Sequence, residues 1–246
     1  MRIFAVGNND YPRNPLSGCI ADAMSWKEFF KDTKGVVSVA TNAKRSQIEA
    51  GLAWVAERGG LFIYSGHGTL TYRNGILCEA ICPIDMAEAG SIADYEIAKL
   101  LTARGKPVVC ILDCCHGNNE FYGRQASLGH GATTGPLLTS RYIETEKIDT
   151  TDLECRAAVG SGAGLWAKTN VALLNACKSN QSSYEGKVNG VQRGYFTTAL
   201  QAVYKPEYSL REWLNRAGKY IRTQYDCDIQ TPRAIGNEAL LKEALK

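Results

Sequence analysis

The stretch PVVCILDCCHG, residues 107–117, decides the fold because the most apolar strand of the chain runs straight into a cluster of reactive side chains. It is apolar up to Asp113, which predicts a strand buried on both faces. Cys114, Cys115 and His116 follow at the carboxyl end of that strand. A thiol there acts as a nucleophile if a histidine or backbone donors favour its thiolate, and otherwise packs as a small buried side chain. By itself this stretch allows both interpretations.

A second stretch, LFIYSGHG at residues 61–68, has the same design. An apolar strand ends at Ser65, and Gly66, His67 and Gly68 follow. Glycines beside a histidine let the backbone adopt unusual torsions and approach a ligand closely. An isolated motif of this kind is usually a tight turn. Here, however, a histidine and a cysteine 48 residues apart both follow apolar strands, which makes them a candidate pair for nucleophilic catalysis.

Strand-like and helix-like segments alternate outward from these two strands. Apolar runs predict strands at residues 2–6, 36–40, 61–65, 108–113 and 171–175, a hairpin or strand at 76–84, and a closing strand at 230–235. Helical spacing predicts helices at residues 19–30, 46–57, 92–101, 195–204 and 210–225. Short apolar strands favour a mainly parallel central sheet with helices on both faces, a three-layer α/β/α fold. Ligands bind such sheets beyond the carboxyl ends of the strands.

Two motifs resemble the metacaspase branch of the caspase family: Tyr64-Ser65-Gly66-His67-Gly68 and Asp113-Cys114-Cys115-His116-Gly117. In caspases the histidine precedes the cysteine by about 50 residues. Residues 16–23 are similar to the family's first helix, and residues 82–85 to the segment after its catalytic histidine. Residues 175–185, which include Glu185, and residues 194–197, which begin at Gly194, are similar to its small subunit. The resemblance covers residues 1 to about 205 and implies the caspase-like fold.

The resemblance implies a cysteine endopeptidase with a Cys-His dyad and an acyl-enzyme. Cys115 would attack the scissile carbonyl, and His67 would protonate the leaving amine and help to activate water. The backbone N–H groups of Gly68 and Cys115 would form the oxyanion hole, where charge develops in the transition state.

The resemblance also implies cleavage after Arg or Lys, because metacaspases bind the residue before the cut in an acidic pocket. The matching positions are Cys19, Asp22, Ser65 and Asp113. Two carboxylates in a partly buried pocket pair well with a guanidinium. Caspases proper hold an aspartate with arginines, and no Arg stands at these positions. Each aspartate has an ordinary alternative role, as a charge near a helix start for Asp22 and as a strand-end cap for Asp113.

By the same comparison residues 1–246 form one catalytic domain, with a large-subunit-like region at 1–122, a linker at 123–168 and a small-subunit-like region at 169–246. Residues 117–168 are rich in Gly, Ser and Thr and weakly periodic, as in a functional or mobile loop. Five basic residues there make self-processing of a zymogen a hypothesis, with solvated surface charge as the alternative for each: Arg124, Arg141, Lys147, Arg156 and Lys168.

The composition is that of a globular protein, with 45% apolar and 22% charged residues among 246. A net charge of +3 is too small to favour nucleic acid, and no apolar run approaches the roughly 20 residues of a membrane span. No signal peptide is recognisable, so we expect a cytoplasmic protein without a membrane partner. Protein or peptide substrates and an activating protein are the expected partners. Nine cysteines without a signal argue against a disulfide framework.

Calcium is the cofactor to consider, since many metacaspases hold it with a cluster of aspartates. The matching stretches offer Asp94, but Tyr95 and Cys78 stand where further aspartates are common. Calcium prefers several oxygen ligands, so we predict no metal and activity independent of calcium.

Other classes stay open at this point. Cys78 with Cys82, and Cys110 with Cys114, are spaced like zinc ligand pairs, although no histidine lies at ligand spacing from either pair. The alternatives are a zinc hydrolase, a separase-type peptidase of the same clan, and an inactive caspase-like scaffold that binds partners.

Overall fold

The structure, a computed structural model, describes residues 1–73, 75–115, 139–144, 166–167, 169–178, 181–225 and 230–245. A central sheet of six strands has the order β12-β9-β7-β3-β1-β2. Its strands are β1 (Arg2–Gly7), β2 (Val36–Thr41), β3 (Gly60–Ser65), β7 (Val108–Asp113), β9 (Val171–Asn175) and β12 (Arg233–Gly236). All neighbours pair in parallel except β12, which runs antiparallel to β9.

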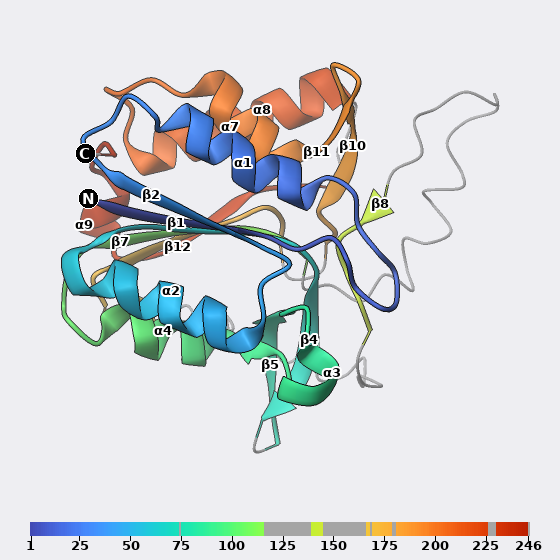
Figure 1. Ribbon diagram of the computed structural model, residues 1–246. Coiled ribbons are helices and arrows are strands. Elements are labelled where there is room, and N and C mark those ends of the chain that lie inside the picture. Colours follow the sequence, from blue (N-terminus) through green and yellow to red (C-terminus); the bar gives the residue numbers. More distant parts are fainter. Residues whose placement is uncertain are drawn as a thin grey trace.

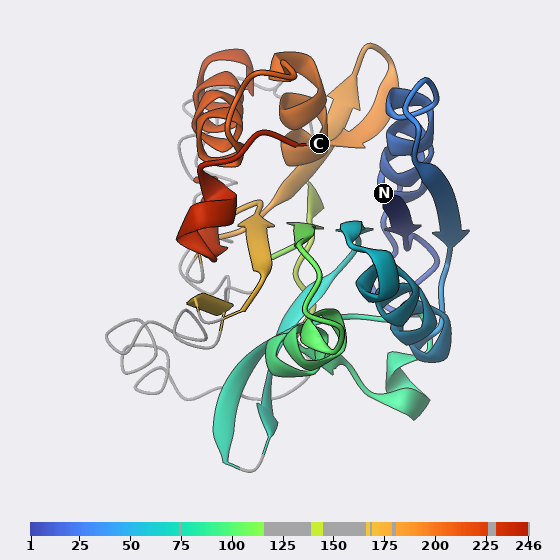
Figure 2. The same cartoon turned by 90° about the vertical axis from the view of Figure 1, so that its left-hand side faces the viewer.

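Helices cover both faces of this sheet, as Figures 1 and 2 show. One face carries α1 (Cys19–Phe29), α7 (Tyr195–Val203) and α8 (Leu210–Tyr225), and the other carries α2 (Arg45–Arg58) and α4 (Asp94–Thr102). Two short helices, α3 (Met86–Ala89) and α9 (Glu238–Leu241), complete the helices described here. The three-layer α/β/α fold that the sequence predicts is thereby confirmed.

Strand β7 explains why the sheet is buried on both sides. Val109 and Ile111 pack into the core under α1, α7 and α8, whereas Val108, Cys110 and Leu112 pack into the core under α2 and α4. Successive strand residues point to opposite faces, so an unbroken apolar run fits a strand between two helical layers. Parallel strands covered on both faces have this sequence pattern.

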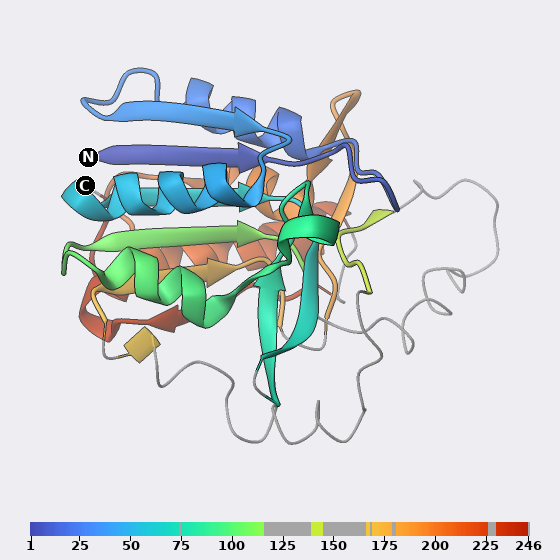
Figure 3. The same cartoon turned by 60° about the horizontal axis from the view of Figure 1, so that its bottom comes forward.

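Two small sheets lie at the carboxyl end of the parallel strands (Figure 3). One contains β4 (Gly68–Arg73), β5 (Ile76–Ile81) and β6 (Ile92–Ala93), and the other contains β8 (Thr139–Ser140), β10 (Tyr184–Val188) and β11 (Val191–Gly194). At that end Ser65 of β3 is in register with Asp113 of β7. The two motifs that follow these residues therefore begin side by side.

Some elements differ from the sequence prediction. Helix α4 begins at Asp94 rather than at residue 92, because Ile92 and Ala93 pair with β5. The hairpin of β10 and β11 is not predicted, although Asn189 and Gly190 both have positive φ, 51° and 83°. An Asn-Gly pair is a strong hairpin signal, but the residues around it are largely polar and form no apolar run that would predict strands. No helix in the described part of the chain is long and apolar enough to cross a membrane.

Candidate active site

His67 is held by its backbone in a network of tyrosine hydroxyls. Its N–H donates to the Tyr11 hydroxyl at 3.1 Å, and its carbonyl lies 2.9 Å from the Tyr64 hydroxyl. A Cβ at Gly66 would overlap the Tyr64 hydroxyl and lie 2.6 Å from that of Tyr11, so only glycine fits before the histidine. The motif therefore fixes the position of the imidazole.

The imidazole of His67 has one occupied and one available nitrogen. Its Nε2 lies 2.6 Å from the carbonyl oxygen of Asn14. A carbonyl only accepts, so Nε2 carries the hydrogen and Nδ1 keeps the lone pair. Nδ1 is buried and has no hydrogen bond of ordinary geometry among the described residues. Burial lowers the pKa of His67, while the carbonyls of Asn14 and Arg141 act in the opposite direction. Because a lowered pKa keeps the imidazole neutral at neutral pH, the ring can accept a proton as a base.

Cys115 is fully buried directly after β7. Its Sγ donates to the Ser183 carbonyl at 3.4 Å and lies 3.7 Å from the Ser140 hydroxyl. Burial raises the pKa of the thiol to about 12, with the Ser183 carbonyl and the Ser140 hydroxyl acting against it. The thiol is therefore protonated at neutral pH and needs a base to become a nucleophile.

Residues 139–144, named the linker segment below, cross this site, beginning with strand β8 (Thr139–Ser140) and continuing through an isolated bridge between Tyr142 and Gly68. Residues 139 and 140 pair antiparallel with β10, and the Arg141 N–H donates to the Ser183 carbonyl at 3.0 Å. The Arg141 carbonyl oxygen accepts from the N–H of Gly68 at 2.9 Å and from the N–H of Cys115 at 3.4 Å. The two donors that the sequence predicts for an oxyanion hole thus converge on one carbonyl of the chain itself.

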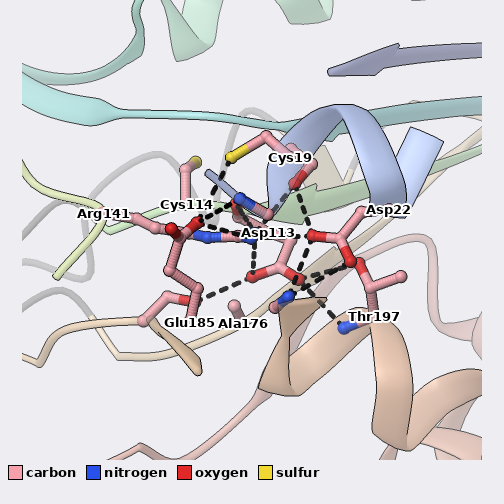
Figure 4. A network of polar contacts seen from close by, with 12 residues as sticks. Cys19, Asp22, Asp113, Cys114, Arg141, Ala176, Glu185 and Thr197 are labelled. Carbon is pink, nitrogen blue, oxygen red and sulfur yellow. Dashed lines mark hydrogen bonds and ion pairs between the residues drawn. The ribbon is translucent and has the colours of Figure 1, made fainter. Parts of the chain in front are cut away.

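The side chain of Arg141 fills a pocket of three carboxylates, named the carboxylate pocket below (Figure 4). Its guanidinium nitrogens lie 2.7 Å from Asp22, 3.1 Å from Asp113 and 3.2 Å from Glu185. The Ser65 hydroxyl accepts a further hydrogen bond at 2.8 Å. All five residues are at most 1% exposed. Burial opposes the guanidinium charge, but Asp113, Cys19, Asp22 and Glu185 raise the pKa of Arg141 well above its ordinary value.

The carboxylates are oriented by partners behind the pocket. Asp113 accepts from the Ser183 hydroxyl and from the N–H and hydroxyl of Thr197, at 2.7 to 2.9 Å. Asp22 accepts from Arg193 at 2.8 Å and from the Gly194 N–H at 3.1 Å. Burial raises the pKa of Asp113, and the Arg141 guanidinium acts against that shift. A buried carboxylate needs such partners to keep its charge.

The residues predicted for the substrate pocket come together, with one difference in detail. Asp22, Ser65 and Asp113 contact the guanidinium directly. Cys19 lies one step away, with its Sγ 3.8 Å from Glu185. Arg141 is described, whereas Arg124, Lys147, Arg156 and Lys168 lie outside the described residues.

Two residues of the pocket carry no predicted role in the sequence analysis. Glu185 is the third carboxylate, and it is fixed by the N–H groups of Ser17 at 2.9 Å and Gly18 at 3.2 Å. A Cβ at Gly194 would overlap Asp113 Oδ2 and lie 2.6 Å from Arg141 Nη1. Both residues stand in segments similar to the small subunit of the family. That similarity marks the two segments, but it does not indicate that Glu185 and Gly194 belong to the pocket.

The cysteine pairs with zinc-like spacing lie in buried positions: Cys78, Cys82, Cys110 and Cys114. Among the residues that the structure describes, no three His, Cys, Asp or Glu side chains form a group that could hold a metal ion.

The six-stranded sheet between helical layers, with a histidine and a cysteine after neighbouring strands, defines a caspase-like α/β protein. A model of the caspase domain, peptidase family C14, matches residues 2–235. The chain therefore belongs to this family of cysteine peptidases.

Comparison with solved structures supports the same fold. Protein GSU0716 from Geobacter sulfurreducens matches with a TM-score of 0.64 and 20% identity, over 98% of this chain and 96% of that one. At that identity the likeness concerns the fold. No curated protein matches.

Proposed function

We propose that this protein is an endopeptidase that cleaves after arginine, and less well after lysine, with Cys115 as nucleophile and His67 as acid–base partner. Its first substrate is the bond between Arg141 and Tyr142 of its own chain. The metacaspase resemblance agrees with this specificity. The observation that carries the proposal is the placement of Arg141, whose carbonyl and guanidinium occupy two separate sites built for them.

The carbonyl of Arg141 supports a role for the linker segment as substrate. A tetrahedral intermediate at this carbon would place its negative oxygen between the Gly68 and Cys115 N–H groups, which already bond to the neutral carbonyl at 2.9 and 3.4 Å. Donors fixed in a site without water stabilise developing charge without reorganising. The Ser140 hydroxyl, one residue before Arg141, lies 3.7 Å from Cys115 Sγ, so the thiol is close to the same peptide.

The chemistry uses the two neutral groups of the resting site. His67 Nδ1 takes the thiol proton, and Cys115 Sγ forms a bond to the Arg141 carbonyl carbon. Collapse of the intermediate breaks the C–N bond, and the same proton goes to the leaving amine of Tyr142. Water activated by His67 then hydrolyses the thioester and frees both thiol and carboxylate. The Asn14 carbonyl keeps the imidazole in the required tautomer.

The carboxylate pocket supports arginine as the preferred residue. Three carboxylates and the Ser65 hydroxyl surround the fork of the guanidinium, which presents several donors in one plane. A lysine presents one compact charge and reaches fewer of these acceptors at once. An aspartate would meet three like charges, so cleavage after Asp is not expected.

The occupied site also supports a zymogen state. While the linker segment fills both the oxyanion hole and the carboxylate pocket, another substrate cannot bind. Removing one partner of a buried ion pair costs about 3–5 kcal/mol, so the segment leaves the site readily only after cleavage or with the help of a partner protein. We expect calcium to have no part in this, because Cys78 is buried and Tyr95 supplies no carboxylate.

Fluorogenic peptides ending in Arg, Lys or Asp test the proposal, with the wild-type chain after self-cleavage and Cys115→Ala compared in calcium and in EDTA. We expect turnover after Arg above that after Lys, none after Asp, none with Cys115→Ala, and no effect of calcium. Turnover after Asp would overturn the pocket assignment. No turnover together with no labelling of Cys115 by a thiol probe in Arg141→Ala, whose carboxylate pocket is empty, would favour the inactive scaffold.

A further inference from the structure

The linker segment also occupies the side of the site beyond the scissile bond. Gly68 donates to the Arg141 carbonyl at 2.9 Å, and its own carbonyl accepts from the Ile143 N–H at 3.1 Å. Tyr142 is joined to Gly68 by a parallel bridge between these two bonds. The backbone after the cut is therefore held in a defined register, and Ile143 is the second residue after the cut.

Ile143 is 5% exposed and belongs to a buried apolar cluster with Tyr11, Leu16, Cys19 and Cys82. Ile84 and Met86 pack against this cluster. The cluster is separate from the two cores on the faces of the sheet. An aliphatic side chain from the linker segment thus fills a cavity whose walls come from elsewhere in the chain.

The walls are held by the same hydrogen bonds that hold His67. The Tyr11 hydroxyl donates to the Cys82 carbonyl at 2.9 Å, accepts from the His67 N–H at 3.1 Å, and lies 3.0 Å from the Tyr64 hydroxyl. The Tyr11 ring lies 4.6 Å from the His67 ring, centroid to centroid. Two of the walls, Tyr11 and Cys82, are thus held by hydrogen bonds in which Ile143 takes no part, and preorganised walls favour binding.

Part of this cluster borders a groove of about 950 Å³. The groove is lined by Ile143, Glu144, Tyr11, Ile84 and Met86, and also by charged side chains, among them Arg13, Lys44 and Arg73. A polypeptide that follows the path of the linker segment therefore has room to continue after the second residue.

We propose that this cavity is a specificity subsite for an aliphatic side chain at the second position after the scissile bond. The inference rests on the proposed function and extends it. Substrates are selected jointly, by arginine before the cut and by a residue such as Ile, Val or Leu two positions after it. The side chains clustered with Ile143 are apolar, and a charged side chain seated among them would lose its hydration.

Internally quenched peptides with the sequence TSRYIE, residues 139–144, test the subsite with Ile replaced by Val, Leu, Gly or Asp. We expect kcat/KM to be similar for Ile and Val and about 10- to 100-fold lower for Asp and for Gly, in line with burial of one aliphatic side chain. A fluorogenic peptide that ends at Arg serves as the control, because it has no residue in the subsite.

The same comparison in the intact chain uses Ile143→Asp with Ile143→Val as matched control, following the cut after Arg141 by mass spectrometry. Ile143→Asp is expected to slow self-cleavage at least about tenfold, and Ile143→Val to leave it near the wild-type rate. A flat peptide series with normal turnover of the control peptide would overturn the subsite and leave the proposed function intact. No turnover of the control peptide together with no cut after Arg141 in the wild-type chain would overturn both.

Discussion

Arg141 and Asp22 are 119 residues apart in the chain and form an ion pair in which neither side chain is exposed, with Nη2 2.7 Å from Oδ2. Exposed ion pairs contribute about 0–1 kcal/mol, but this one is buried with two further carboxylates. Such an arrangement suits a pocket that binds the cationic side chain of a substrate and that is occupied by the chain's own Arg141 before a substrate binds.

Self-cleavage after position 141 should depend on which residue stands there. Arg141→Ala should abolish the cut after position 141, and Arg141→Lys should retain it at a reduced rate, because lysine keeps the charge but not the planar fork. Intact-mass measurement of the purified chains with time gives the site and the rate. Equal cutting in Arg141→Ala and wild type would contradict the assignment.

The same substitution should affect stability. Removal of the guanidinium leaves three buried carboxylates without it, so Arg141→Ala should lower the free energy of unfolding by about 3 kcal/mol. Added arginine amide, which can refill the carboxylate pocket, should restore part of the loss. Thermal unfolding with and without arginine amide, at equal ionic strength, measures both effects, and an unchanged melting temperature in all samples would speak against the pocket.

Gly194 is predicted to be essential for arginine binding. Its substitution to Ala places a methyl group against Asp113 Oδ2 and Arg141 Nη1, and overpacking of this kind costs about 1–3 kcal/mol. We expect kcat/KM after Arg to fall by about 5- to 150-fold. Gly218→Ala in α8 is the matched control, because its Cβ would meet only ordinary contacts, from 3.5 Å outward.

Glu185 should contribute to arginine affinity without taking part in the chemistry. Glu185→Gln keeps the size and the acceptor for the Ser17 N–H but removes one charge. A hydrogen bond to a charged group is worth about 1.5–3 kcal/mol, so KM for an Arg peptide should rise about 10- to 100-fold with a smaller effect on kcat. Steady-state kinetics separate the two constants. An effect confined to kcat would mean that Glu185 acts on the reacting groups instead.

The pH dependence follows from the two buried groups. Because burial lowers the pKa of His67, the imidazole stays neutral down to below pH 6.5, and kcat/KM should decline only as the pH falls through that lowered pKa. The pKa of Cys115 is about 12 with the linker segment in place. Alkylation of the intact chain by iodoacetamide should therefore be slow at pH 8 and faster in Arg141→Ala. Equal alkylation rates would contradict this prediction.

The amino-acid sequence predicted the architecture well, because burial of a strand on both faces requires an apolar run that is visible in the local sequence. The apolar runs of β3 and β7 follow from burial on both faces, and the glycine before His67 follows from the two hydroxyls that leave no room for a Cβ. The fold and the family are confirmed. Assignment to the metacaspase branch stays a prediction, as do the catalytic roles.

The sequence by itself determined which strands are followed by a histidine and a cysteine, since those motifs are continuous in the chain and parallel strands bring their carboxyl ends to one edge. Only the tertiary structure placed the Arg141 guanidinium among the carboxylates, joined Glu185 and Gly194 to the pocket, and packed Ile143 into its apolar cluster. The physical reason is that these contacts join residues up to 172 positions apart. Charge pairing and close packing over such separations leave no periodicity in the sequence.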